Sequence, residues 1–315
     1  MENFLNKLKP IITPRWAPYF FLSPFLILFL VFGIFPLLFS LLLAFESWDP
    51  VQGLDSMKFI GMENFIFLAE DEWFWKSLYN TMWLALVSGI PQHLVAIPLA
   101  SYIHSIIGRW RNAVVGVYFI PYITSTVAMA ILFSALFSTD YGVVNNMIAW
   151  LRQLPFLGLV LPDTAIDWLG EPSNIKPAIS LMVFWRYVGF NTVLYLAALQ
   201  AIPKETYEAA RLDGASTIQQ FFHITLPLLK PMMFFTVTLS VIGGLQLFEE
   251  PFVLTGGRGG SDQAGMTTAM YMYRTAFEFN DFGTASAISW ALFLVVAVLT
   301  FITHKLFSTS KREQL

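Results

Sequence analysis

Arg186, Glu249 and Glu250 are ionisable residues that lie inside long apolar stretches of the chain. A charge within a membrane span is costly, and by default it marks a functional site with a partner nearby. At the 1.5 Å rise per residue of a helix, Arg186 lies about 26 Å from the proline that ends its stretch, and Glu249 about 27 Å from the proline that begins the next. The matching depth supports two compatible interpretations. Arg186 forms a salt bridge with Glu249 or Glu250, or these groups bind the hydroxyls of a ligand.

Tyr122 and Thr126 are a second polar pair within an apolar stretch. At positions i and i+4 they share one face of a helix. Hydroxyl groups in membrane helices often bond to their own backbone or to another helix, so these residues have an explanation that needs no ligand. Further aromatic, hydroxyl and amide side chains within the apolar stretches are Trp185, Tyr187, Ser240 and Gln246.

The chain contains few side chains suited to catalysis or metal binding. There is no cysteine, and the four histidines are scattered singly, without the spacing of a zinc site. We therefore expect no catalytic residue and no metal. The glycine-rich stretch 254–260 lacks the Lys-Ser/Thr that follows the glycines of a nucleotide loop, and the chain has no such motif elsewhere. Glu249 and Glu250 could serve as acid and base in a membrane-embedded enzyme, for instance one acting on lipid-linked sugars, but no third group joins them.

The composition is that of an all-α polytopic membrane protein in contact with lipid. Of 315 residues, 56% are hydrophobic and only 12% are charged, whereas soluble domains have about a quarter charged residues. The net charge of −3 argues against a nucleic-acid partner. A helix needs about 20 apolar residues to cross the hydrocarbon layer. Six stretches reach this length, at roughly 18–45, 78–103, 112–137, 176–200, 230–253 and 284–306.

The distribution of lysine and arginine predicts the orientation of the chain, because cytoplasmic segments collect basic residues. Basic residues are concentrated near the N-terminus, after the second stretch, in the loop 201–230 and in the C-terminal tail. We predict that both termini and this loop are cytoplasmic. The expected organisation is an N-terminal segment 1–17, a six-helix membrane domain 18–307 and a tail 308–315.

The loop between the fourth and fifth stretches carries a specific motif. It reads EAA at 208–210, Gly214 after three further residues, and Ile-x-Leu-Pro at 224–227 after nine more. Helix-forming residues followed by Asp213 and Gly214 predict a short helix, a turn and a second helix, because glycine readily takes the left-handed conformation that ends a helix. Pro227 stands where we expect the next membrane helix to begin. This pattern resembles, at every defined position, the EAA loop of membrane subunits of binding-protein-dependent ABC importers.

The resemblance covers residues 18–307 and is closest to the first of the two unlike permeases in maltose and multiple-sugar importers. It implies a type I importer permease fold in the bacterial inner membrane and a carbohydrate, specifically a di- or oligosaccharide, as cargo. The implied partners are a second permease in a heterodimer, two ATP-binding cassette subunits and an extracytoplasmic solute-binding protein. ATP and magnesium are expected on the partner ATPase, with no cofactor on this chain. The residues expected to couple to the ATPase are Glu208, Ala209, Ala210, Arg211, Asp213 and Gly214.

In sugar-importing members of this family, the positions that match Tyr122 and Thr126 face the translocation path. We therefore expect one cavity near mid-membrane, where aromatic rings stack on a sugar and polar groups bind its hydroxyls. Alternatives remain open: a charged sugar derivative or polyol phosphate as cargo, or a secondary transporter, although the chain shows no internal repeat. The residues expected to form the substrate path are Tyr122, Thr126, Trp185, Arg186, Tyr187, Ser240, Gln246 and Glu249.

Overall fold

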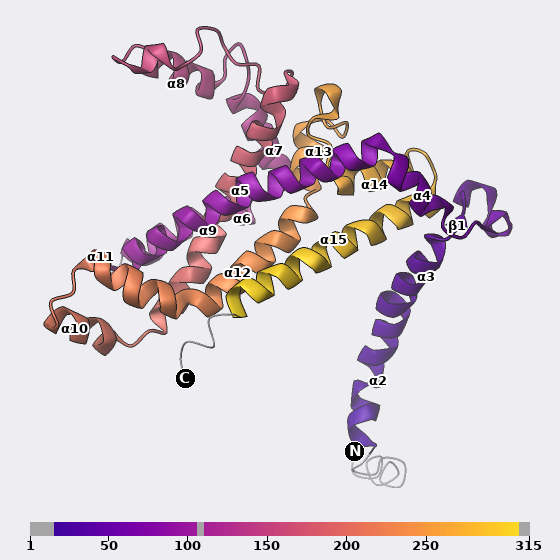
Figure 1. Cartoon of the computed structure of the whole chain (residues 1–315), viewed down its shortest axis with the longest axis horizontal. Coiled ribbons are helices and arrows are strands. Elements are labelled where there is room, and N and C mark those ends of the chain that lie inside the picture. Colours follow the sequence, from indigo (N-terminus) through magenta and orange to yellow (C-terminus); the bar gives the residue numbers. More distant parts are fainter. Residues whose placement is uncertain (1–15, 106–109, 309–315) are drawn as a thin grey trace, which may run out of the picture. The chain divides into compact units, whose positions relative to one another are not determined.

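The structure is a computed structural model that describes residues 16–105 and 110–308. It is mostly helical and divides into two compact units, each of which is described by itself (Figure 1). Much of the expected N-terminal segment and tail, and Arg109 in the basic loop, lie outside the described residues.

Unit 1 comprises the N-terminal part of the chain up to Glu70 together with Thr275–Trp290. Its first span, Ala17–Leu43, is helical throughout and includes a π-helical turn at Leu30–Ile34. The large apolar side chains of this span are mostly exposed, as expected of a helix that contacts lipid. The elements that begin in unit 1 are α2 (Ala17–Phe29), α3 (Phe35–Leu43), β1 (Glu46–Ser47), β2 (Lys58–Phe59), α4 (Glu63–Glu70) and α15 (Phe282–Ser308), which continues into unit 2.

The buried side chain of Asn64 holds the end of this unit together. Its amide donates to the carbonyl oxygens of Ala44 and Glu46, both at 3.0 Å, and its Oδ1 accepts from the Thr284 hydroxyl at 3.2 Å. The short strands β1 and β2 pair antiparallel beside it. One amide thus satisfies backbone groups that the chain leaves open where the first span ends.

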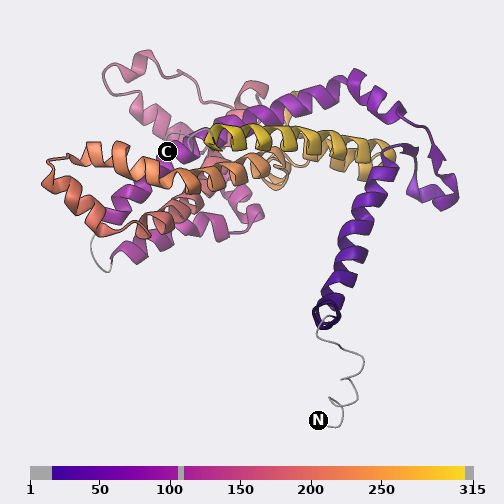
Figure 2. The same cartoon turned by 60° about the horizontal axis from the view of Figure 1, so that its bottom comes forward.

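Unit 2 comprises Asp71–Arg274 and the end of α15, and it holds every residue of the expected substrate path and coupling loop. Its longest helices are α5, α9 and α12, which pack against one another (Figures 1 and 2). The elements that begin in it are α5 (Glu72–Ser105), α6 (Trp110–Ile123), α7 (Thr126–Leu136), α8 (Val143–Leu151), α9 (Pro172–Gln200), α10 (Lys204–Leu212), α11 (Thr217–Gln220), α12 (Leu226–Leu245), α13 (Glu249–Leu254) and α14 (Thr268–Phe277), with short 3-10 turns at Leu157–Leu159 and Ser261–Gln263.

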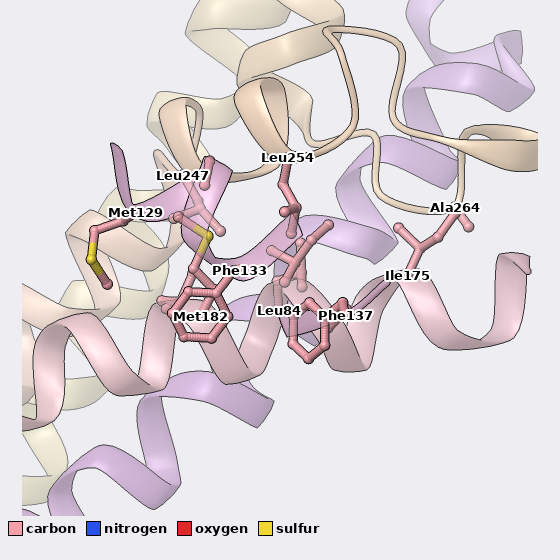
Figure 3. Packing of buried hydrophobic residues seen from close by; sticks show 13 residues of the cluster. Leu84, Met129, Phe133, Phe137, Ile175, Met182, Leu247, Leu254 and Ala264 are labelled. Carbon is pink, nitrogen blue, oxygen red and sulfur yellow. The ribbon is translucent and has the colours of Figure 1, made fainter. Parts of the chain in front are cut away.

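Two apolar clusters form the interior of unit 2. The first joins α5, α7, α9 and α13 through residues such as Leu84, Phe133 and Met182 (Figure 3). The second joins α5, α9 and α12 through residues such as Ile103, Leu199 and Leu229. Because α5 and α9 contribute to both clusters, these two helices form the centre of the unit.

Glycine permits a close contact between α9 and α6. A Cβ atom placed on Gly189 would overlap the carbonyl oxygen of Tyr118. Small residues let the backbones of membrane helices approach one another in this way. The contact brings the segment that carries Tyr122 beside the middle of α9.

The third apolar stretch is not the single helix that the sequence predicts. Within the described part of the chain, α6 ends at Ile123 and α7 begins at Thr126, with a bend of 94° between them. Ser125 is extended at the break, and the Thr124 hydroxyl donates to the carbonyl of Ile120 at 2.8 Å. Consecutive hydroxyl residues compete for backbone hydrogen bonds in this way and weaken a helix. The prediction that Tyr122 and Thr126 share one helix face is therefore wrong.

The fifth stretch also departs from expectation. Helix α12 ends at Leu245, non-helical residues follow, and Glu249 begins a separate short helix, α13. The expected continuous span 230–253 is wrong, and so is the depth calculation that treated Glu249 as part of it. At its other end the helix extends further than expected, since α11 and a π turn at Phe221–Thr225 make Thr217–Leu245 one continuous helix. The described residues thus contain five spanning helices, or six if α6 and α7 count as one broken span.

Candidate functional site

Arg186 forms a buried ion pair with Glu250. Nη1 of Arg186 lies 3.1 Å from Oε1 of Glu250, and the two side chains are only 13% and 5% exposed. The hydroxyl of Tyr187 donates to the same carboxylate oxygen at 3.2 Å. Of the two partners predicted for Arg186, Glu250 is therefore the one that pairs with it. In a low-dielectric interior, removal of one partner would leave the other charge buried without compensation, which strongly destabilises the fold.

Thr126 extends this cluster to Glu249. Its hydroxyl accepts a hydrogen bond from Nη1 of Arg186 and donates one to Oε2 of Glu249 at 2.7 Å. Thr126 is the first residue of α7 after the bend, and Glu249 and Glu250 are the first residues of α13 after the other break. Arg186 on the unbroken helix α9 therefore fixes the positions of both broken segments. Pairing Thr126 with these charges depends on the bend that the sequence analysis missed.

A cavity of about 220 Å³ lies between α5, α6, α9 and α12. Tyr122, Tyr187 and Ser240, which belong to the predicted path, line it. The ring of Tyr122 stacks on that of Phe190, with 4.3 Å between the ring centroids, and meets that of Tyr187 edge-on, with 5.8 Å between the centroids. The cavity is lined by Ala85, Ser88, Gly89, Gln92, Tyr122, Val183, Tyr187, Phe190, Asn191, Leu239, Ser240, Gly243, Gly244 and Leu247.

Amide groups on the cavity wall were missed by the sequence analysis. The amide of Asn191 donates to Oε1 of Gln92 at 3.1 Å, which joins α9 to α5, and both side chains are buried. Ser88 and Gln92 are four residues apart on α5 and therefore share a face. Polar residues at this spacing within an apolar stretch were the available signal. The hydrogen bond between Gln92 and Asn191 depends on the packing of two helices, which no local sequence pattern predicts.

Other residues of the predicted path lie away from this cavity. Arg186, Thr126 and Glu249 form the ionic cluster, and they are not among the lining residues. Trp185 is 52% exposed, and Gln246 is exposed at the end of α12. The structure thus divides the predicted set into a cavity group, an ionic group and two outlying residues.

The coupling segment, residues 204–225, forms the expected helix, turn and second helix at one end of the unit (Figure 1). Helix α10 includes the EAA residues and ends in a turn in which Gly214 has φ +82°. The amide of Gly214 donates to the carbonyl of Arg211 at 3.0 Å, and that of Ala215 to the carbonyl of Ala210 at 2.9 Å. These two bonds are the Schellman pattern, in which glycine in the left-handed conformation ends a helix.

The second half of the segment is capped equally well. The Ser216 hydroxyl accepts from the amide of Gln219, whose side chain accepts from the Ser216 amide, which completes a capping box. The Tyr207 hydroxyl lies 3.0 Å from that of Thr225 and ties α10 to the base of α12. The predicted coupling residues lie on α10 and its turn, whereas Ser216 already belongs to the next helix.

The outward side chains of the coupling segment have no cover within the described structure. Glu208, Ala209, Arg211 and Asp213 are exposed. Leu212 is 90% exposed, and Ile218 on α11 is also exposed. Exposed apolar side chains among charged ones are typical of a surface that binds another protein.

Comparison with known families decides what kind of protein has this arrangement. Residues 94–310, which include the coupling segment and the cavity walls formed by α6, α9 and α12, match the family described as "Binding-protein-dependent transport system inner membrane component". The chain belongs to this family. It is therefore a multi-pass permease of the bacterial inner membrane, as predicted, and its EAA segment is typical of the family.

Several relatives of this permease are similar to it over nearly their full length. The arabinooligosaccharides transport system permease protein AraP of Bacillus subtilis is 33% identical over 96% of this chain and 91% of its own. The lactose transport system permease protein LacF of Rhizobium radiobacter is 35% identical, with coverage of 90% and 91%. The trehalose/maltose transport system permease protein MalF of Thermococcus litoralis is 30% identical, with coverage of 96% and 97%.

Solved structures agree with the predicted fold. A chain of a bacterial ABC transporter involved in the import of the acidic polysaccharide alginate superimposes on this permease with a TM-score of 0.78. The two are 25% identical, and the match covers 98% of this chain and 99% of the other. A second structure, of the alginate transporter in complex with an alginate pentasaccharide-bound periplasmic protein, gives a TM-score of 0.75 at 25% identity and covers 95% of this chain and 94% of that one. The predicted all-α importer permease fold is confirmed.

Proposed function

We propose that this permease carries a neutral di- or oligosaccharide across the inner membrane. Three of its relatives are named for arabinooligosaccharides, for lactose and for trehalose and maltose, whereas two others are named for sulfoquinovosyl glycerol and for sn-glycerol-3-phosphate. The observation that supports the proposal within the chain is the cavity between the spanning helices, which combines aromatic rings with amide and hydroxyl groups. Sugars bind to such a mixture, because their apolar faces stack on rings and their hydroxyls need polar partners.

Aromatic rings and amide groups both line the cavity. Tyr122, Tyr187 and Phe190 supply rings, and the paired amides of Gln92 and Asn191 supply donors and acceptors. The volume of about 220 Å³ is below the range of about 300–1,000 Å³ usual for ligand pockets. We therefore expect a second, unlike permease subunit to complete the cavity around a sugar larger than one ring.

The charges of the site favour a neutral sugar over a charged derivative or a polyol phosphate. The lining residues include no lysine, arginine, aspartate or glutamate among those that the structure describes. The nearby Arg186 is already neutralised by Glu250, and Glu249 lies within the same cluster. An anionic cargo would therefore find no unpaired cation on the described part of the cavity wall to balance its charge.

The coupling segment is proposed to dock on a separate ATPase subunit that binds ATP and magnesium. Its backbone is fixed by the Schellman turn and the capping box, while Leu212 and its charged neighbours stay exposed. A rigid backbone with uncovered side chains is what a docking element needs, because little entropy is lost on binding. In this proposal both termini and the segment face the cytoplasm, the chain itself hydrolyses no ATP, and a solute-binding protein delivers the sugar from outside.

Reconstitution in proteoliposomes with the second permease, the ATPase and the binding protein tests the proposal. We expect ATP-dependent uptake of at least one of lactose, maltose, trehalose and arabinotriose. Uptake restricted to anionic probes such as glycerol 3-phosphate would contradict the neutral cargo. Uptake driven by an ion gradient without ATP would instead indicate a secondary transporter.

A pair of aromatic variants locates the path. Tyr122 lines the cavity, whereas Trp185 lies on an exposed face outside it. Tyr122→Ala should therefore raise KM for the transported sugar, and Trp185→Ala should leave KM unchanged. The reverse result would place the path elsewhere.

A further inference from the structure

A line of hydrogen-bonded side chains leads from the cavity into the interior of unit 2. The hydroxyl oxygen of Ser240, a residue on the cavity wall, lies 3.0 Å from Nε2 of His93. Nδ1 of His93 lies 2.9 Å from the hydroxyl of Tyr195, which lies 2.7 Å from that of Thr236. The line alternates between helices, since Ser240 and Thr236 belong to α12, His93 to α5 and Tyr195 to α9.

The inner end of this line is fixed by packing. Tyr195 and Thr236 are fully buried, and Tyr195 belongs to the apolar cluster that joins α5, α9 and α12. The rings of His93 and Tyr195 meet edge-on at 6.0 Å. The hydroxyl of Thr236 is also within 2.9 Å of the carbonyl of Met232, one turn earlier in its own helix. The orientation of the His93 ring is thus held from behind, and only the Ser240 end opens to the cavity.

The hydrogen bonds of this line run in one direction. A neutral imidazole has one N–H donor and one acceptor nitrogen, and each hydroxyl has one hydrogen. Thr236 donates to Tyr195, so Tyr195 donates to Nδ1 and Nε2–H donates to Ser240. The Ser240 hydrogen is then free to point into the cavity. In this arrangement Nε2 holds the Ser240 oxygen in one place, and Ser240 offers a hydrogen-bond donor to the cavity.

We propose that His93 is a positioning residue for substrate, held by Tyr195 and Thr236, and that it fixes the Ser240 hydroxyl toward the sugar in the cavity. This inference rests on the proposed function, because it assigns Ser240 to that same sugar site. A purely structural role would need only the links between helices. The proposed role requires in addition that the Nε2 side of His93, rather than the Nδ1 side, control sugar affinity.

Two isosteric variants separate the two sides of the ring. The Gln amide of His93→Gln reaches the position of Nε2 and keeps the bond to Ser240, whereas the Asn amide of His93→Asn reaches the position of Nδ1 and keeps the bond to Tyr195. The measurement is KM for a radiolabelled sugar in proteoliposomes holding the complete importer. The probe is whichever of lactose, maltose, trehalose and arabinotriose is taken up fastest.

We expect KM to rise about two- to tenfold in His93→Asn, the range for one neutral hydrogen bond, and to stay within about twofold of wild type in His93→Gln. Both variants lose one of two bonds, so their melting temperatures should fall by similar amounts. In a Ser240→Ala background, His93→Asn should cause no further rise in KM.

Ser240→Ala alone distinguishes failure of the site from failure of the inference. An unchanged KM in Ser240→Ala would remove Ser240 from the site and overturn the cavity assignment together with this proposal. A raised KM in Ser240→Ala with equal KM values in His93→Gln and His93→Asn would overturn only the positioning role. Additive effects of His93→Asn and Ser240→Ala would overturn it as well.

Discussion

The ionic cluster around Arg186 and the coupling segment around Gly214 are both polar, but they are stabilised differently. In the cluster, Arg186 has its main partners, Glu250 and Thr126, within the chain. In the coupling segment the backbone and the capping side chains have partners, but side chains such as Leu212 remain exposed. The difference indicates that the cluster maintains the fold of the permease, whereas the segment awaits another subunit.

The largest functional effect is expected in the coupling segment, from Gly214→Pro. Proline cannot adopt the φ of +82° found here, and it has no amide hydrogen to donate to Arg211. We expect ATP-driven transport to be lost while the protein inserts and melts normally, because nothing lies within 4 Å of a Cβ at this exposed position. Gly214→Asn is the matched control, since asparagine tolerates the left-handed conformation. Full transport by an inserted Gly214→Pro protein would contradict the coupling role.

The ionic cluster should show the opposite behaviour, with stability affected first. Arg186→Ala leaves the Glu250 carboxylate buried without its partner, which we expect to lower the free energy of unfolding by about 3–5 kcal/mol. Arg186→Ala combined with Glu250→Ala should be less destabilised than Arg186→Ala alone. Thermal unfolding in detergent measures this, and strictly additive losses would rule out the pairing. Glu249→Ala is the control variant, because Glu249 is linked to Arg186 through the Thr126 hydroxyl.

The cavity wall should respond in affinity more than in stability. Tyr122→Ala removes a ring that stacks on Phe190 and faces the cavity. A stacking contribution of about 1 kcal/mol corresponds to about a fivefold higher KM for the transported sugar. Stimulation of the ATPase by the binding protein should persist, because the coupling segment is untouched. Loss of that stimulation would show that the cavity and the segment cannot be separated.

The smallest effect is expected from Ser216→Ala, which removes the hydroxyl of the capping box. Such a cap contributes about 1 kcal/mol, and here it stabilises only the start of α11. Hydrogen exchange should therefore rise at the amide of Gln219 while exchange in α9 stays unchanged. Faster exchange throughout the bundle would mean that the segment is part of the folding core after all.

The sequence predicted those features that depend on local pattern. Apolar length located the first, second, fourth and sixth spans within a few residues, and Gly214 located the turn of the coupling segment. It failed where the chain is apolar on both sides of a break, as at Ser125. The break before Glu249 has the same character, and it changes which glutamate reaches Arg186. Consecutive hydroxyl residues weaken the helix at the first break, but the contacts of Thr126 and Glu250 with Arg186 depend on how the helices pack.

The candidate site was predictable to a similar degree. Tyr122, Tyr187 and Ser240 were found because aromatic and hydroxyl groups stand out in apolar stretches. The bond between Gln92 and Asn191 joins residues 99 positions apart, and so does not appear in any local window. The cavity is therefore a property of how α5 packs against α9.

The continuous helix Thr217–Leu245 has a mechanical consequence. Its 29 residues give a rod about 43 Å long at 1.5 Å per residue, with the coupling segment at one end and Ser240 near the other. A tilt of about 10° around its midpoint would displace each end by about 4 Å in opposite directions. A movement of the end that carries the coupling segment would thus move the cavity end by a similar distance in the opposite direction. The π turn at Phe221–Thr225, close to the start of this helix, is where the helix can bend.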